Sequence, residues 1–271
     1  MFQKLDKSKL PNLANAWPAI ATHLAAYDPG NQYAVNYMWG TVGIGYNVKK
    51  ARERLGEAKI DSWDTVFHPA ELARFKDCGV HMLDSSDDIL PAALHFIGRN
   101  PNSTDQGDLE KAADLVAKVR PSVRKFHSSE YLNALASGEI CLVVGWSGDI
   151  KQAHDRAREA GKGDIAYSIP REGAMSNYDV LAIPADAPHV RNAHLFINYL
   201  LRADVAARNS ELIKYANALS PDIQPLERAV RDDPGVYPPP EVRARLVPER
   251  PRPADYQRLL TRMWTRFKTG K

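Results

Sequence analysis

The feature that most constrains the fold is an alternation of strand-like and helix-like segments along the 271 residues. Apolar or alternating runs typical of strands lie at residues 33–39, 79–84, 139–146, 164–170 and 178–185. Segments with helical spacing of apolar residues lie between and after them, at 48–55, 108–119, 130–136, 150–160, 193–201 and 203–215. A proline-rich stretch then leads to a final helix expected at 254–268. This order predicts an α/β protein in which helices cover a sheet.

One glycine-rich stretch, "GTVGIGYN" at residues 40–47, follows the first strand-like run. It has neither the lysine and hydroxyl residue of a phosphate-binding P-loop nor the spacing of a dinucleotide fingerprint. We therefore expect a tight backbone crossing after the strand that ends at Trp39.

The composition excludes two classes of protein. With 36 basic and 33 acidic residues the net charge is only +3, and the basic residues form no run, which argues against a nucleic-acid or membrane-surface protein. No stretch approaches the roughly 18 apolar residues of a membrane-spanning helix. The start, "MFQKLDKSKLPN", lacks the apolar core of a secretory signal. From these residues alone the protein is either cytoplasmic or a chain whose leader has been removed.

No cofactor, metal site or enzyme activity is expected. The eight histidines stand in no metal-ligand spacing. The serine of "GWSGD" does not fit a nucleophile elbow, because Asp149 stands where that motif needs glycine and Ser147 has no base nearby. The two cysteines, Cys78 and Cys141, are either buried free thiols or one disulfide, and a disulfide would imply an oxidising compartment.

Carboxylates stand beside aromatic residues at the ends of several expected strands. Asp149 follows Trp146, Asp179 follows Tyr178, and "LDSSDD" places Asp84, Asp87 and Asp88 after a third strand. Ligands of open α/β sheets bind beyond the strand ends, so these residues could line a pocket for an organic cation. For each aspartate alone the alternative is a helix cap or a solvated loop, and "LDSSDD" has the form of a helix start capped by Ser85 or Ser86.

The motifs "GWSGDI", "SIPREGAM", "YDVLAIPADA", "IKYANA" and "HSSEYLNALASGEICL" resemble those of the periplasmic polyamine-binding proteins of bacterial ABC importers, above all the putrescine-binding branch. The resemblance continues in order through "YMWGTVGIGYN", "GVYPPPEVRARL" and the terminal "TRMWTRFKTGK". It implies a two-lobed type II periplasmic-binding fold that closes on a polyamine, putrescine before others, in a cleft between the lobes. It also implies a monomer in the periplasm that delivers its ligand to ABC permease subunits, and no nucleic-acid partner.

The resemblance also implies a division of the chain. Residues 1–36 and 151–203 are expected in lobe one, and residues 37–150 and 204–271 in lobe two. "MFQKLDKSKLPN" resembles the interior of family members, so lobe one is expected to lack its N-terminal part and the chain to lack a signal peptide. It would then be a fragment, the product of a misplaced gene start, or a truncated paralogue.

The expected site residues come from the same resemblance. Trp146 matches an aromatic wall, and Asp149 and Asp179 match carboxylates that take the ammonium groups. The cleft would also contain Tyr178, Tyr215 and Ser128, and Asp88 stands where the family has glutamate, so it is expected to reach its ammonium through a water. Cys78 and Cys141 stand where putrescine-binding members have a disulfide.

One residue leaves the ligand open. Asn177 stands where close relatives have phenylalanine, so an amide replaces an apolar wall. Putrescine, cadaverine, spermidine and an amino-guanidine all remain candidates. The alternatives to transport are a truncated paralogue that no longer binds and a ligand-sensing domain of the same fold.

Overall fold

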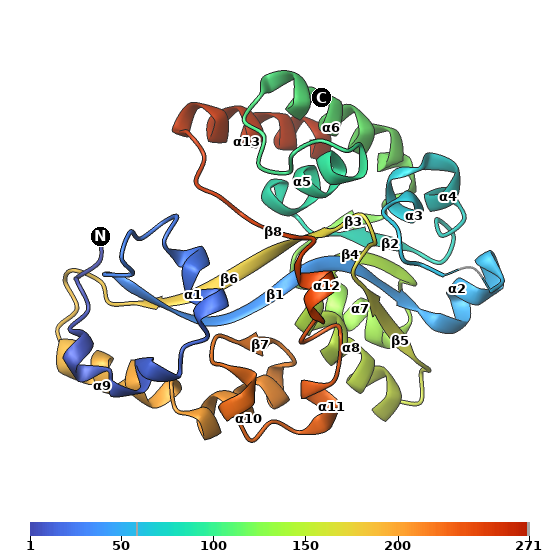
Figure 1. Cartoon of the computed structure of the whole chain (residues 1–271). Helices are drawn as coiled ribbons and strands as arrows, with labels where there is room; N and C mark the ends of the chain where they lie inside the picture. The colour runs from blue at the N-terminus through green and yellow to red at the C-terminus, as the bar shows by residue number, and fades with distance from the viewer. Residues whose placement is uncertain (58, 270–271) are drawn as a thin grey trace. The chain divides into compact units, whose positions relative to one another are not determined.

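A computed structural model describes residues 1–57 and 59–269 (Figure 1). The chain forms two compact units. Unit 1 comprises Met1–Gly40 and Ser176–Pro238, and unit 2 comprises Thr41–Met175 and Pro239–Lys271. Two of the three boundaries fall within long strands, β1 (Ala34–Asn47) and β6 (Ala174–Ala182), and the third falls between Pro238 and Pro239.

These units differ from the expected lobes in three segments. Residues 37–40 lie in unit 1, so the first boundary falls four residues later than expected. Residues 151–175 lie in unit 2, because β5 (Ile165–Ser168) pairs antiparallel with the second half of β1. Residues 204–238 lie in unit 1, because β7 (Ala216–Asn217) pairs with β1 at Met38 and Trp39. Strand pairing therefore decides to which unit these segments belong, and no local sequence pattern reveals that pairing.

Unit 2 is built on a mixed sheet, as the alternation of segments predicts. Strands β3 (Lys125–Phe126), β2 (Val80–Met82) and β4 (Leu142–Trp146) are parallel neighbours. The second half of β1 runs antiparallel to β4, and β8 (Leu246–Pro248) follows β6 in the strand order. Because β3, β2 and β4 are parallel, their carboxyl ends share one edge.

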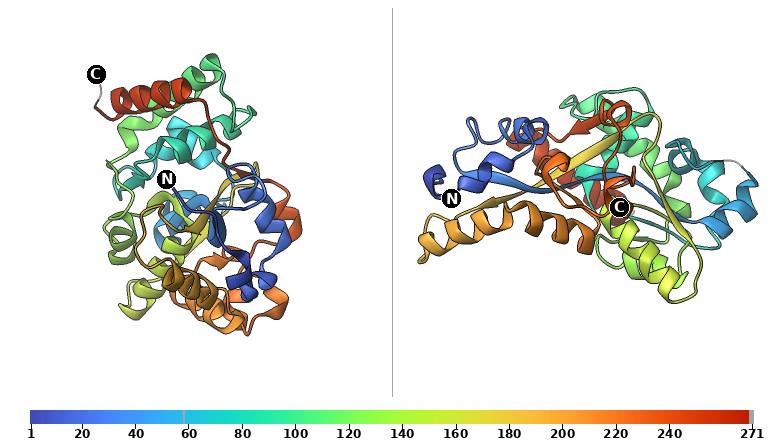
Figure 2. Two further views of the ribbon diagram at one scale, coloured as in Figure 1. Left: turned by 90° about the vertical axis from the view of Figure 1, so that its left-hand side faces the viewer. Right: turned by 60° about the horizontal axis from the view of Figure 1, so that its bottom comes forward.

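The helices of unit 2 are α2 (Val48–Leu55), α3 (Asp64–Phe67), α4 (Pro69–Ala73), α5 (Ser86–Phe96), α6 (Gln106–Val119), α7 (Tyr131–Ser137), α8 (Ser147–Glu159), α12 (Pro240–Arg243) and α13 (Ala254–Thr269), with the 3-10 turn η3 (Arg120–Ser122). The final helix, α13, lies against α5 and α6, and both Figure 1 and Figure 2 show this arrangement. No helix in the described ranges is long and apolar enough to cross a membrane.

Unit 1 contains the helices α1 (Pro18–Leu24), α9 (Val190–Leu200), α10 (Ala203–Ile213) and α11 (Arg228–Arg231), and the 3-10 turns η1 (Lys7–Lys9), η2 (Pro11–Asn15) and η4 (Pro221–Ile223). Its core includes Leu10, Ile183 and Leu219. Leu195, Phe196 and Tyr199 of α9 are exposed, so this helix carries apolar side chains on more than its buried face.

The glycine-rich stretch is not the tight crossing that its composition suggested. Residues 40–47 continue β1 without a break. A Cβ atom on Gly43 would lie 2.5 Å from the carbonyl oxygen of Ser168, and one on Gly45 would lie 2.8 Å from the side chain of Ile150. These glycines therefore allow a neighbouring strand and helix to approach β1 closely, which is the other common use of glycine in a strand.

The disulfide between Cys78 and Cys141 is confirmed. Its Cα atoms are 5.6 Å apart, and the two cysteines precede the neighbouring parallel strands β2 and β4. The bond therefore joins the chain just before both strands begin.

Removing this bond should destabilise the protein. The two cysteines are 63 positions apart, so the bond closes a long loop of the unfolded chain. We expect the Cys78→Ala/Cys141→Ala variant to lose about 2–4 kcal/mol of unfolding free energy in urea. Wild-type protein under reducing conditions is the control, and its urea midpoint should match that of the variant. A midpoint unchanged from the oxidised protein would contradict the expectation.

Candidate functional site

Polar residues of unit 2 gather where the parallel strands end. Helix α5 begins four residues after β2, and α8 begins directly after β4. Asp88 and Asp149 lie in the first turns of these two helices. The unpaired amide groups and the dipole of a helix N-terminus favour acidic side chains, and both aspartates stand at such positions.

Trp146 connects these two carboxylates. Its indole Nε1 donates a hydrogen bond to Oδ2 of Asp88 at 3.3 Å. Its backbone amide donates to the hydroxyl of Tyr131 at 3.2 Å, and that hydroxyl donates to Oδ2 of Asp149 at 2.7 Å. Asp88 is buried, whereas Trp146 and Asp149 are half-buried. One network therefore holds an aromatic side chain and two carboxylates of unit 2.

Tyr131 was not predicted as a site residue. It is fully buried at the start of α7, and its ring lies edge-on to that of Trp146 at 6.4 Å between centroids. Its role depends on the packing of α7 against α8 and β4. The only signal in the sequence is its place in the "HSSEYLNALASGEICL" motif.

Ser128 follows β3 at the same edge of the sheet. Its Oγ accepts a hydrogen bond from the backbone amide of Asp84 at 3.0 Å. The expected polar contact with a ligand is therefore accompanied by a second role, because Ser128 ties the end of β3 to the turn after β2.

In unit 1, β6 carries Asn177, Tyr178 and Asp179. Successive side chains of a strand point to opposite faces, so Asn177 and Asp179 share one face and Tyr178 lies on the other. The Tyr178 ring stacks with His23 at 4.7 Å and with Trp39 at 6.2 Å between centroids. Asp179 and Asn177 therefore lie together on one face of β6, and Tyr178 packs against His23 and Trp39 on the other.

Asp179 is exposed, but nearby protein still removes part of the water around its carboxyl group. This desolvation raises the pKa of Asp179 above its ordinary value. Burial likewise raises the pKa of Tyr37, and the charge of Asp179 adds to that effect. A carboxylate with a raised pKa gains more than an ordinary one from a bound cation.

Tyr215 lies between α10 and β7, half-buried. The preceding Lys214 has a left-handed backbone conformation, φ 60°, that ends α10. Two residues on, buried Asn217 donates to Ser210 Oγ at 2.9 Å and Gln224 Oε1 at 2.6 Å. This network and the pairing of β7 with β1 fix the backbone that presents Tyr215.

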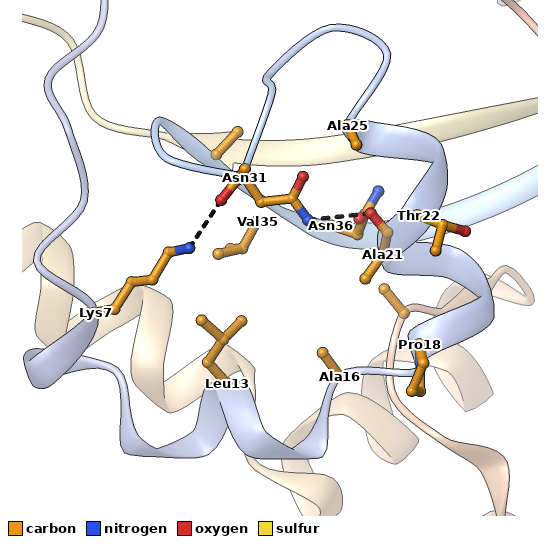
Figure 3. Close-up of a pocket in the computed structure, with 13 residues that line it drawn as sticks. Lys7, Leu13, Ala16, Pro18, Ala21, Thr22, Ala25, Asn31, Val35 and Asn36 are labelled. Atoms are coloured by element: carbon orange, nitrogen blue, oxygen red, sulfur yellow. Dashed lines mark hydrogen bonds between the residues drawn. The ribbon is translucent and has the colours of Figure 1, made fainter.

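Unit 1 also has a separate pocket of about 470 Å³ (Figure 3). Its walls are mostly apolar, from Leu13, Ala21, Ala25 and Val35. Lys7 lines it and donates to the carbonyl of Gly30 at 3.0 Å. None of the described residues that line it is acidic. A positively charged side chain without a carboxylate does not suit a polyamine, so this pocket is not the candidate site.

Comparisons with known proteins decide the family. The family of bacterial extracellular solute-binding proteins matches residues 1–237. The chain belongs to this family. It is 46% identical to the putrescine-binding periplasmic protein PotF of Escherichia coli and 45% identical to the putrescine-binding periplasmic protein SpuD of Pseudomonas aeruginosa. Each match covers 100% of this chain and 74% of the relative.

Solved structures of this family have the same fold. A putative spermidine/putrescine ABC transporter protein from Listeria monocytogenes superposes with a TM-score of 0.85 at 27% identity, over 100% of this chain and 79% of that one. The expected two-lobed α/β fold is therefore confirmed. The family consists of extracellular solute-binding proteins and not of enzymes, which agrees with the prediction for this chain.

Loss of the Tyr131 hydroxyl should destabilise unit 2. Tyr131→Phe keeps the buried ring but leaves the amide of Trp146 without this acceptor. We expect a loss of about 1–2 kcal/mol in unfolding free energy, measured by urea denaturation. Tyr33→Phe is the matched control at an exposed position and should change stability by less than about 0.5 kcal/mol. Equal effects of the two substitutions would show that the hydroxyl network contributes nothing.

Proposed function

We propose that this chain binds a polyamine outside the cytoplasm and delivers it to the permease of an ABC transporter. The observation that carries the proposal is the network of Trp146 with Asp88 and Asp149, because an indole and carboxylates are the groups that recognise an alkylammonium ion. The names of the most similar relatives support the same ligand class. The periplasm is the proposed compartment, and a monomer is the proposed state.

Putrescine is the proposed ligand. Moving an ammonium group out of water costs several kcal/mol unless a carboxylate and further hydrogen bonds replace the water. Asp149 in unit 2 and Asp179 in unit 1 would each take one ammonium group, with Asp88 as a further acceptor. Trp146 and Tyr215 would cover the methylene chain, and Ser128 and Asn177 would supply polar contacts. Cadaverine and spermidine differ in length and charge and serve as comparison ligands.

The carboxylates can be tested by calorimetric titration of the 271-residue chain. We expect Asp149→Asn and Asp179→Asn each to weaken putrescine binding by at least about tenfold, because an amide cannot neutralise an ammonium ion. Asp114→Asn and Asp186→Asn, at exposed positions of units 2 and 1, are the matched controls.

Two outcomes would contradict the proposal. If the wild-type chain binds none of putrescine, cadaverine and spermidine, polyamine binding by this chain is wrong. If it binds but all four substitutions have the same small effect, the assignment of Asp149 and Asp179 is wrong.

Binding should also weaken in acid. The pKa of Asp179 is raised in the free protein, so protonation starts at a higher pH than for an ordinary aspartate and removes the charge that binds an ammonium. We expect putrescine affinity to fall as the pH is lowered from about 7 to about 4, and to fall less in Asp179→Asn, which cannot titrate there. If putrescine affinity falls by the same factor with pH in the wild type and in Asp179→Asn, Asp179 does not face the ligand.

A further inference from the structure

The three aspartates of "LDSSDD" have three different partners. Asp88 accepts from Trp146, as described above. Asp84 accepts hydrogen bonds from Trp264 Nε1 at 2.8 Å and from Lys268 Nζ at 2.7 and 2.8 Å. Asp87 pairs with Arg252. Asp84 and Asp87, which both precede the candidate ligand contact Asp88 in the sequence, are therefore held by the C-terminal segment.

The contacts with Asp84 are buried on the side of Trp264, whereas the side chains of Lys268 and Asp84 are 32% and 37% exposed. Trp264 has 6% of its surface exposed, and its ring packs against Phe126 of β3 at 5.6 Å between centroids. Burial by itself would raise the pKa of Asp84, but the hydrogen bonds from Lys268 and Trp264 outweigh it and hold that pKa below its ordinary value. Asp84 therefore stays ionised at neutral pH and remains paired with α13.

The contact with Asp87 involves Arg252 and Gln257. The side chain of Arg252 is 4% exposed, which is rare for arginine, and its Nη1 contacts the Asp87 carboxylate. Gln257, in the first turn of α13, lies 3.5 Å from the same carboxylate. A buried guanidinium needs carboxylate partners, and Arg252 has Asp87 and, at 3.6 Å, Glu249, so the pair with Asp87 constrains where Asp87 can lie.

Asp88 lies just after these two anchored residues in the sequence. It follows Asp87 directly and Asp84 by four residues, at the junction of the turn and α5. Ser128 holds the same turn from β3 through the amide of Asp84. The backbone that leads into Asp88 is thus held by charged groups that belong to a segment more than 160 residues later in the sequence.

We propose that the C-terminal segment from Arg252 to Lys268 is a clamp that positions Asp88 for ligand binding, with Arg252, Trp264 and Lys268 as positioning residues. The inference rests on the proposed function, because it concerns the affinity of that site. A carboxylate held in place loses less conformational freedom when it binds an ammonium, so a loosened clamp should weaken binding.

A double-mutant cycle tests the clamp by calorimetry with putrescine. We expect Lys268→Met to weaken binding about fivefold in the wild type and less than about twofold in an Asp88→Asn background, because the clamp acts through Asp88. Lys268→Arg should restore affinity. Arg262→Met removes a charge from an exposed position of the same helix and should leave affinity unchanged. Equal losses in the two backgrounds, or no loss from Lys268→Met, would overturn the inference.

A second readout needs no ligand and separates failure of the clamp from failure of the proposed function. The indole N–H of Trp146 is bonded to Asp88, so its cross-peak in a ¹H–¹⁵N spectrum reports the position of that carboxylate. We expect Lys268→Met to shift this cross-peak and Arg262→Met to leave it in place. An unmoved cross-peak in a folded Lys268→Met protein would overturn the clamp, whether or not the wild type binds putrescine.

Discussion

The parallel pairing of β2 with β4 is the constraint on which the unit 2 site depends. Met82 lies opposite Val144 in this pair, so the strands end side by side and the chain turns into α5 and α8 at one edge. The disulfide joins the same two strands at their other end. The register of a strand pair sets the positions of the residues that follow each strand. Fixing this register therefore also fixes where Asp88 and Asp149 lie.

Each carboxylate of the unit 2 site is stabilised before any ligand arrives. Asp149 accepts from the hydroxyl of Tyr131, and Asp88 accepts from the indole of Trp146. Their positions in the first turns of α8 and α5 add the favourable field of a helix N-terminus. Asp179 differs, because partial desolvation raises its pKa and makes its charge costly without a cation. Asp88 and Asp149 of unit 2 thus have hydrogen-bond donors within the protein, whereas the carboxylate of Asp179 in unit 1 is desolvated.

The turn after β2 shows how one short acidic stretch serves several purposes. A carboxylate cannot be left buried without a partner, and each of Asp84, Asp87 and Asp88 has a different one. Two of these partners come from the C-terminal segment and one from β4. A stretch that looks uniformly acidic in sequence is thus divided between stabilising the fold and supplying a candidate ligand contact.

The sequence by itself determined the fold class and many of the elements, and it indicated the chemistry of a candidate site. The periodicity predicted the α/β class and a C-terminal helix, and aspartates beside aromatics at strand ends indicated a cation site. It could not show that Gly43 and Gly45 lie within one long strand, since glycine permits both a turn and close packing. Nor could it assign residues 151–175 and 204–238 to their units. Only the tertiary structure revealed Tyr131 between Trp146 and Asp149, and Lys268 on Asp84, because such contacts depend on how helices pack and not on spacing along the chain.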